Sequence, residues 1–415
     1  MNTLKKIHEI ESYIKETWNK EPYVSDLSLF TGVSGVPIFY YMLYQYTNES
    51  KYLDKIEIIL NLIFERLNES DENIPKTYCL GLAGIGYMLN FLEESDELKN
   101  IDFTEALEVI DEILLDTIDY FLSYIDHIDS KDKMEHIDFL HGVSGIAHYF
   151  LERNKKEIFS GKITILFEKL SEIVKWDYEK ALESINNTEI NQNSHKINIG
   201  LAHGHISFIL LFSKFLSLVP DNQIVREGIK TSVKTVLLFR NDDENSFCQF
   251  PSIAVNKHTA NYNIHLGWCY GDQSVSYGLY KAGKILNDIN LIALSEEIAL
   301  STIKRKSLQL ALLNEENCDA GFCHGTISVA YYHKKWYSIT SNVEFLKLYK
   351  KFTNDTLLIA NKGNGLAGYK KKTATGEYQN TLGLLDGIAG IGVFLIDSLL
   401  NENISIKWES IFLID

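Results

Sequence analysis

Prolines and long apolar runs are scarce in this sequence, and each shortage excludes something. Five prolines in 415 residues leave nearly the whole chain open to long helices. No window approaches the roughly 18 uncharged apolar residues of a membrane span. The start, Met1–Lys20, is charged throughout and lacks the apolar core of a signal peptide. We therefore expect a cytoplasmic protein with no transmembrane segment.

Cysteines are also few, and their number is odd. They are Cys79, Cys248, Cys269, Cys318 and Cys323. In a reducing compartment such thiols serve metal binding or catalysis more often than disulfides. Cys79 and Cys248 are interpreted as inert core residues.

Basic charge is outnumbered, with 40 Lys and Arg against 56 Asp and Glu, so the net charge is −16. This excess argues against nucleic acid or an anionic membrane surface as the main partner. It would suit a cationic peptide or protein, although acidic charge can also serve solubility alone.

One pattern is abundant. Gly-x-x-(Gly/Ser) followed by an apolar run occurs seven times, and successive first glycines are 49 to 67 residues apart. These first glycines are Gly32, Gly81, Gly142, Gly204, Gly271, Gly325 and Gly387. The apolar runs predict buried inner helices, and amphipathic segments between them, such as Thr104–Leu122, predict outer helices.

Seven inner and seven outer helices predict an all-α protein, either an open solenoid or a closed toroid. Closure is favoured because neither terminal repeat carries a polar cap. We expect a single domain over residues 1–415, built as an α/α toroid (barrel). Residues 241–267 are expected to form a rim loop or a small β-containing insert.

The repeat also supplies a register for polar side chains. Position −1 before the first glycine holds His141, His203, Tyr270 and His324 in repeats three to six, and position −2 holds Cys79, Cys269 and Cys323 in repeats two, five and six. Equivalent repeats would bring the residues of repeats four to six together at one end of the inner helices. Two thiols and one imidazole are a suitable ligand set for a catalytic zinc.

Cys269, Cys323 and His324 are therefore predicted to bind one zinc ion per chain. Cys318 is a rival ligand, and the −2 register favours Cys323. A zinc that already holds two thiolates is better suited to lowering the pKa of an incoming thiol than to hydrolysis. The site thus indicates thiol addition or alkylation.

Three motifs make the family recognisable. Gly267-Trp268-Cys269-Tyr270-Gly271, Cys323-His324-Gly325 and Gly200-Leu201-Ala202-His203-Gly204, together with the seven repeats, resemble the lanthipeptide (lantibiotic) cyclases, the LanC family. The resemblance spans roughly Leu29 to Leu400 and is to the stand-alone class I type. It implies a toroid of seven inner and seven outer helices around one zinc ion.

The resemblance also implies an activity. Family members are zinc-dependent lanthionine synthetases that add precursor-peptide cysteine thiols to dehydroalanine or dehydrobutyrine, which forms lanthionine or methyllanthionine thioether rings. The implied partner is a dehydrated leader–core precursor peptide. A dehydratase and an exporter can join in a synthetase complex, which can hold the cyclase peripherally at the membrane.

Site residues carry over by position. Cys269, Cys323 and His324 match the family's zinc ligands. His203 matches its active-site histidine, a candidate acid or base, and Asp138 matches an aspartate that would pair with that histidine.

Two further positions complete the implied site. Tyr270 matches a tyrosine beside the site, a candidate donor to the enolate oxygen. The family usually has arginine four residues before the first zinc cysteine, and His265 stands there in this chain. Because an imidazole need not be charged, a fixed cation for the enolate is missing from that position.

Two alternative functions remain open. One is another zinc-thiolate transferase on a helical toroid, such as a prenyltransferase-like enzyme, although those use an Asp-Cys-His ligand set. The other is a non-catalytic LanC-like peptide-binding protein, which His265 favours. A helical-toroid glycosidase is least favoured, because the motif positions hold thiols and imidazoles in place of paired carboxylates.

Overall fold

The structure is a computed structural model, and nearly all of the chain that it describes is helix or loop. It describes residues 2–69, 74–128, 133–153, 161–185, 194–241, 243, 246–260, 262, 265–312, 319–360, 364–373, 376–400 and 406–415. These residues group into two compact units. Unit 1 is Met1–Asp116, Glu316–Tyr331 and Tyr349–Ile411, and unit 2 is Thr117–Glu315, Tyr332–Leu348 and Phe412–Asp415.

Helices of unit 1 come from both ends of the sequence. They are α1 (Thr3–Thr17), α2 (Val36–Thr47), α3 (Lys51–Glu69), α4 (Leu82–Glu93) and α17 (Ile388–Asp397), with the short 3-10 turns η1 (Tyr23–Ser25), η2 (Val33–Gly35) and η3 (Asp96–Leu98). A small antiparallel hairpin, β3 (Lys371–Lys372) with β4 (Tyr378–Gln379), belongs to this unit.

Unit 2 holds the middle of the chain. Its helices are α6 (Lys133–His136), α7 (Val143–Arg153), α9 (Lys162–Ser184), α10 (His205–Leu218), α11 (Gln223–Leu238), α12 (Asp272–Leu286), α13 (Ile289–Thr302) and α14 (Leu308–Leu312). Strand β1 (Ile197–Asn198) pairs antiparallel with β2 (Ile253–Ala254), which lies in the segment expected to form a rim loop or insert. Four elements contribute residues to both units, namely α5 (Thr104–Tyr124), α15 (Thr326–Thr340), α16 (Val343–Ala360) and η4 (Trp408–Phe412).

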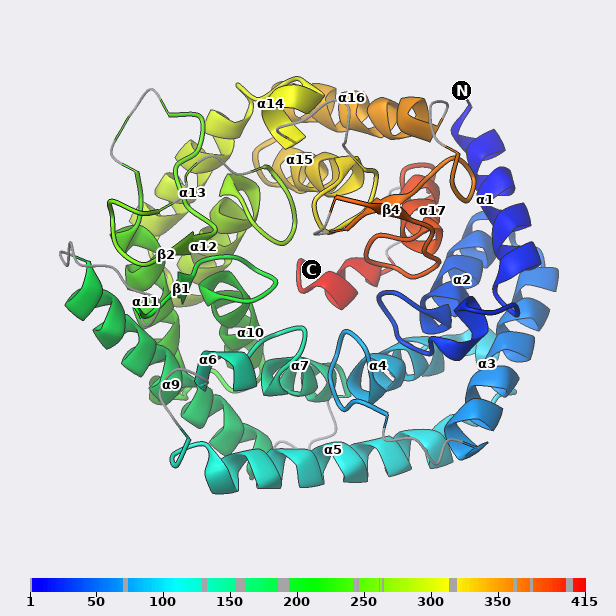
Figure 1. The fold of residues 1–415 in the computed structure, drawn as a ribbon, viewed down its shortest axis with the longest axis horizontal. Helices are drawn as coiled ribbons and strands as arrows, with labels where there is room; N and C mark the ends of the chain where they lie inside the picture. Colours follow the sequence, from blue (N-terminus) through cyan, green and yellow to red (C-terminus); the bar gives the residue numbers. More distant parts are fainter. Residues whose placement is uncertain are drawn as a thin grey trace. The chain divides into compact units, whose positions relative to one another are not determined.

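Inner and outer helices differ in how their apolar residues are spaced. In α10 nearly every residue is buried, as the continuous apolar run behind Gly204 predicts. In α11 the buried residues recur every three or four positions, from Val225 through Ile229 to Val236, which is one face of an amphipathic helix. The buried face of α11 packs on α10, and α10 in turn packs on α12 (Figure 1).

The first and last repeats pack together within unit 1. Helix α17 lies against both α1 and α2, as Figure 1 also shows. A Cβ added at Gly392 would lie 2.4 Å from the Phe39 ring and 3.3 Å from Ile10, so only glycine lets α17 fit between the two helices. Backbone bonds from Gly383 N–H to Thr31 O (3.2 Å) and from Leu385 N–H to Phe30 O (3.0 Å) join the loops of the seventh and first repeats. An open solenoid would leave these repeats without such contacts.

The motifs that begin at Gly32, Gly81, Gly325 and Gly387 are each preceded by a loop that closes on this glycine. The backbone N–H after the glycine bonds to the carbonyl oxygen seven residues earlier, as in Val33 to Asp26 (2.8 Å), Leu82 to Pro75 (2.8 Å), Thr326 to Asp319 (3.2 Å) and Ile388 to Thr381 (3.2 Å). That bond satisfies one of the N–H groups that a helix leaves unpaired at its start. A Cβ at Gly32, Gly81 or Gly204 would lie 2.2 Å or less from that carbonyl oxygen, which explains why the motif begins with glycine.

Apolarity along the described helices is interrupted by charge. Among the described residues, no helix combines the length and the apolar character needed to cross a bilayer.

Candidate metal centre

Cys269 lies in the loop that leads into α12. Its carbonyl oxygen accepts hydrogen bonds from the N–H groups of Leu201 (2.8 Å) and Ala202 (3.3 Å), both in the loop before α10. The side chain is buried, and its Sγ lies 3.6 Å from Nε2 of His265. Backbone bonds therefore hold the thiol in place independently of any ligand.

Trp268 anchors the same loop from the other side. Its ring is fully buried, and its indole N–H donates to the carbonyl oxygen of Phe412 at 2.8 Å. The ring also packs edge-on against Phe412 and near Phe139, with centroid distances of 5.9 and 6.5 Å. In this motif, Trp268 thus fixes the loop in place and Cys269 supplies the thiol.

Gly200 allows the loop before α10 to approach Cys269. A Cβ at this position would lie 2.4 Å from the carbonyl oxygen of Cys269 and 2.3 Å from the Tyr270 ring. The Tyr270 hydroxyl accepts a hydrogen bond from Nδ2 of Asn198 at 3.1 Å. Asn198 and Tyr270 therefore come together from neighbouring loops of unit 2.

Cys323 and His324 lie in the equivalent loop before α15. The Cys323 N–H donates to Oδ1 of Asp386 (3.3 Å), and the Phe322 N–H donates to the carbonyl oxygen of Leu385 (2.5 Å). This last bond occupies the same register as the Leu201 to Cys269 bond. The two cysteine-bearing loops are thus held by the same kind of backbone contact.

Asp319 lies behind His324. Its buried carboxylate accepts the N–H groups of Gly321 (3.0 Å) and Lys372 (3.3 Å), and Oδ2 lies 3.3 Å from Nε2 of His324. Burial alone would lower the pKa of His324, but hydrogen bonds to Asp319 and Cys323, together with their negative charges, outweigh burial and raise the pKa to about 12. A carboxylate on one ring nitrogen of a metal-ligating histidine fixes the ring and its tautomer.

The three predicted ligands form a group that could hold a metal ion. The ligand atoms of Cys269, Cys323 and His324 all lie within 4.8 Å of one another, and no other such group of three occurs among the described residues. A tetrahedral zinc ion with two sulfurs and one nitrogen would hold these atoms about 3.5–3.8 Å apart. The soft donor set fits zinc and disfavours magnesium or calcium. The rival ligand Cys318 lies outside the described residues.

His203 and Asp138 form a hydrogen-bonded pair in unit 2. Nδ1 of His203 lies 2.7 Å from Oδ2 of Asp138, and the other oxygen of Asp138 accepts the His141 N–H at 2.7 Å. About a third of the His203 side chain is exposed. The His141 ring stacks near that of His203, with centroids 5.9 Å apart, and burial is the main cause that lowers the pKa of His141.

His265 does not supply a permanent cation. Its Nε2 lies beside Cys269 Sγ, at the position where the family usually has arginine. The structure thus places an imidazole against a candidate ligand thiol. Whether His265 has a catalytic role stays a prediction.

The sequence analysis did not identify three residues of this region, namely Asn198, Asp319 and Lys371. Asp319 and Asn198 occupy position −6 before the first glycine, so extending the register back to the start of the closing loop would have found both. His265 occupies the same position in the fifth repeat. Lys371, whose Nζ lies 2.9 Å from Oδ2 of Asp386, carries no signal of this kind because it lies on the hairpin between two repeats.

Comparisons with known proteins agree with these motifs. A family model described as lanthionine synthetase C-like protein matches residues 23–413. A search of curated protein sequences finds no match to the chain. The structure of nisin cyclase is similar over 99% of this chain and 97% of its own, with 17% sequence identity and a TM-score of 0.74.

Other solved structures show lower similarity. A Listeria innocua protein is 12% identical over 96% of this chain and 97% of its own, with a TM-score of 0.45. A GH76 alpha-mannanase of Bacteroides thetaiotaomicron is 8% identical over 96% and 95%, with a TM-score of 0.41.

The likeness to nisin cyclase, at its low identity, shows the fold. The expected all-α class and α/α-toroid fold are therefore confirmed. Since the family model covers nearly the whole sequence, the chain belongs to the lanthionine synthetase C-like family.

Proposed function

We propose that this protein is a zinc-dependent lanthipeptide cyclase. Membership of the lanthionine synthetase C-like family and the fold shared with nisin cyclase support a lanthionine-forming enzyme with a peptide substrate. The observation that carries the finer proposal is the approach of Cys269, Cys323 and His324 to within 4.8 Å. We infer that these residues hold one zinc ion and leave one coordination position for the substrate.

Zinc at this site would lower the pKa of a substrate cysteine thiol, so that a thiolate exists at neutral pH. The protein's own residues fix the geometry around it. Asp319 orients the His324 ring, and the carbonyl bonds of Cys269 orient the first thiol. A rigid ligand set reduces the reorganisation needed when the substrate arrives.

His203 is the proposed proton carrier. With Nδ1–H donating to Asp138, Nε2 is left as the atom that accepts or delivers a proton. The partial exposure of the ring lets a peptide reach that nitrogen. Tyr270, whose hydroxyl is oriented by Asn198, is the proposed donor to the enolate oxygen.

The reaction is an addition, and its atoms balance without any other reagent. The substrate thiol loses a proton, and its sulfur bonds to the β-carbon of dehydroalanine or dehydrobutyrine. The electron pair of the double bond moves to form an enolate. One proton then returns to the α-carbon, which leaves a thioether ring with the mass of the open peptide.

A matched set of cysteine variants tests the proposal. Purified protein should contain about one zinc per chain. Cys269→Ala and Cys323→Ala should each lose zinc and ring formation, whereas Cys248→Ala should keep both. Cys248 is the matched control for Cys269, because the two side chains are similarly buried and Cys248 lies outside the ligand group.

The assay should use a synthetic peptide with one cysteine and one dehydroalanine, and should follow loss of the alkylatable thiol and the stereochemistry of the product. His203→Ala should keep zinc but lose stereospecific closure. Normal product from His203→Ala would remove its proposed role, and full zinc in Cys269→Ala would contradict the ligand assignment. A protein that binds zinc and peptide but forms no ring would favour the non-catalytic peptide-binding alternative.

A further inference from the structure

The proposed reaction passes through anions, and the position usually held by arginine offers no permanent positive charge. A thiolate forms first and an enolate follows. Both are stabilised by a fixed cation near the site. His265 stands at the arginine position, so a permanently charged side chain near the site would come from elsewhere in the chain.

Lys371 is held beside the loop that carries Cys323. Its Nζ lies 2.9 Å from Oδ2 of Asp386, while Oδ1 of the same carboxylate accepts the Cys323 N–H at 3.3 Å. One buried carboxylate therefore joins the ammonium group to the ligand loop. Its close approach depends on Gly321, where a Cβ would lie 2.7 Å from Oδ1 of Asp386.

The hairpin that carries Lys371 is itself fixed to the site. Strand β3 pairs with β4, so that Lys371 lies opposite Gln379. The N–H of the next residue, Lys372, donates to Asp319, the carboxylate behind His324. The Lys371 side chain is about 28% exposed, so its charge is only partly screened by water.

The negative groups around Lys371 favour its charged form. Burial lowers the pKa of Lys371, but Asp386 outweighs this effect and the thiols of Cys323 and Cys79 add to it, so the pKa is raised. Lys371 therefore stays charged. Without it, the carboxylates of Asp319 and Asp386 would leave net negative charge around Cys323, which would oppose a second, visiting thiolate.

We propose that Lys371 supplies the fixed cation of this site, in place of the arginine absent at position 265. It neutralises Asp386 and favours the binding of the substrate thiolate near Cys323. The inference rests on the proposed function, because it concerns how that site accepts a thiol. Lys371 acts here through its charge, as a positioning residue.

The test replaces the charge while keeping the shape. Lys371→Met removes the ammonium, Lys371→Arg keeps a cation, and Lys372→Met makes the same change at the next residue of the strand as a control. Zinc content is measured first, and cobalt(II)-substituted protein is then titrated with N-acetylcysteine methylamide. Sulfur-to-cobalt charge-transfer absorption reports thiol binding without any need for turnover.

Lys371→Met should retain metal but bind the thiol about tenfold more weakly, the effect of losing one nearby opposite charge. Lys371→Arg should restore most of the affinity, and Lys372→Met should match wild type. Loss of metal in Lys371→Met would show a structural role for the loop and overturn the inference. Unchanged thiol affinity would overturn it equally.

A double variant keeps the inference testable if Lys371→Met is poorly folded. Because the charges of Lys371 and Asp386 offset each other and the two residues are coupled, Asp386→Asn in the Lys371→Met background should regain part of the lost thiol affinity. No recovery in a folded double variant would exclude a role through charge. Wild-type protein that binds no metal or closes no ring would refute the proposed function, whereas normal wild-type behaviour with an unaffected Lys371→Met variant would refute only this inference.

Discussion

Asn198, His265 and Asp319 each begin the loop of a repeat, at the same distance before its first glycine. Asn198 donates to the hydroxyl of Tyr270, His265 lies beside the thiol of Cys269, and Asp319 lies beside the ring of His324. A side chain at this shared position therefore orients a second side chain. The second side chain lies four or five residues further along the chain or in the next loop.

At the residue scale, Asp319→Asn should weaken zinc binding about 10- to 100-fold. Asparagine has the same size and can still accept the Gly321 N–H, but it lacks the charge that holds the His324 imidazole. Competition with a chromophoric chelator measures the affinity. Asp221→Asn, at an exposed position, is the control. An affinity within about twofold of wild type would remove Asp319 from the site.

At the scale of elements, the loop before α12 depends strongly on its glycine, Gly271. Gly271 has φ +110°, and a Cβ there would lie 2.4 Å from the carbonyl oxygen of His265. A side chain would therefore meet both an unfavourable backbone conformation and a collision with backbone.

Gly271→Ala should accordingly lower the free energy of unfolding by about 2 kcal/mol or more. It should also reduce zinc content, since Cys269 lies two residues away. Gly161→Ala is a matched control at another helix start, because a Cβ there meets nothing within 4 Å. Chemical denaturation of both variants gives the comparison, and equal stability for the two would contradict this account of the loop.

Much of the helical arrangement follows from the sequence because burial leaves a periodic trace. The inner runs and amphipathic segments such as Thr104–Leu122 correspond to α10, α5 and their counterparts. An outer helix was expected after the fifth motif, but no segment was identified for it. This helix is α13, whose apolar residues do not form one stripe, and Ile289 and Leu300 are exposed. The pairing of α1 with α17 joins distant ends of the chain and leaves no local pattern.

In the candidate site, too, some residues could be identified from the sequence and others could not. Cys269, Cys323 and His324 could be selected because the repeat register aligns them, and their approach agrees with that selection. Lys371 and Asp386 could not be paired in advance, because a hairpin between repeats brings the lysine to the carboxylate. The repeat register gives no information about contacts between a repeat and a segment inserted between repeats.

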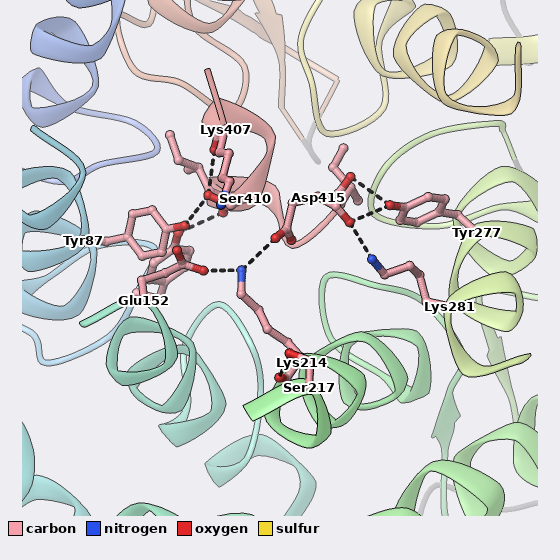
Figure 2. Close-up of polar contacts among 12 residues, drawn as sticks. Tyr87, Glu152, Lys214, Ser217, Tyr277, Lys281, Lys407, Ser410 and Asp415 are labelled. Carbon is pink, nitrogen blue, oxygen red and sulfur yellow. Dashed lines mark hydrogen bonds and ion pairs between the residues drawn. The ribbon is translucent and has the colours of Figure 1, made fainter. Parts of the chain in front are cut away.

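At the scale of the whole molecule, the last described residues are bound into unit 2 by charge. Figure 2 shows Asp415 between two lysines. Lys214 pairs with its side chain at 3.0 Å and also with Glu152, while Lys281 and Tyr277 donate to its backbone oxygen at 2.8 Å each. Burial alone would raise the pKa of Asp415, but Lys214 and Lys281 outweigh it and lower the pKa to about 2.

This lowered pKa has a definite sign for stability. Because the folded value lies below the ordinary value of 3.8, the interaction stabilises the fold above that pH and is lost as the pH falls toward 2. Asp415→Asn should therefore cost about 1–2 kcal/mol at pH 7, a range that allows for the partial exposure of the carboxylate. The difference from wild type should shrink between pH 4 and pH 2. Urea unfolding at several pH values measures it, and a difference that grows on acidification would contradict the assignment.

The closing loops have a consequence for altering the chemistry of this protein. In loops such as the one from Asp26 to Gly32, a backbone carbonyl at the first position and the glycine close the loop. The side chain at the first position also accepts a backbone N–H two residues further on, as Asn198 does from Gly200 and Asp319 from Gly321. At positions 198 and 319, one side chain thus both shapes its loop and orients a group of the candidate site. A library meant to explore new thiol chemistry should therefore vary residue 265 freely but keep Asn or Asp at residues 198 and 319, because both can accept the N–H that holds the loop.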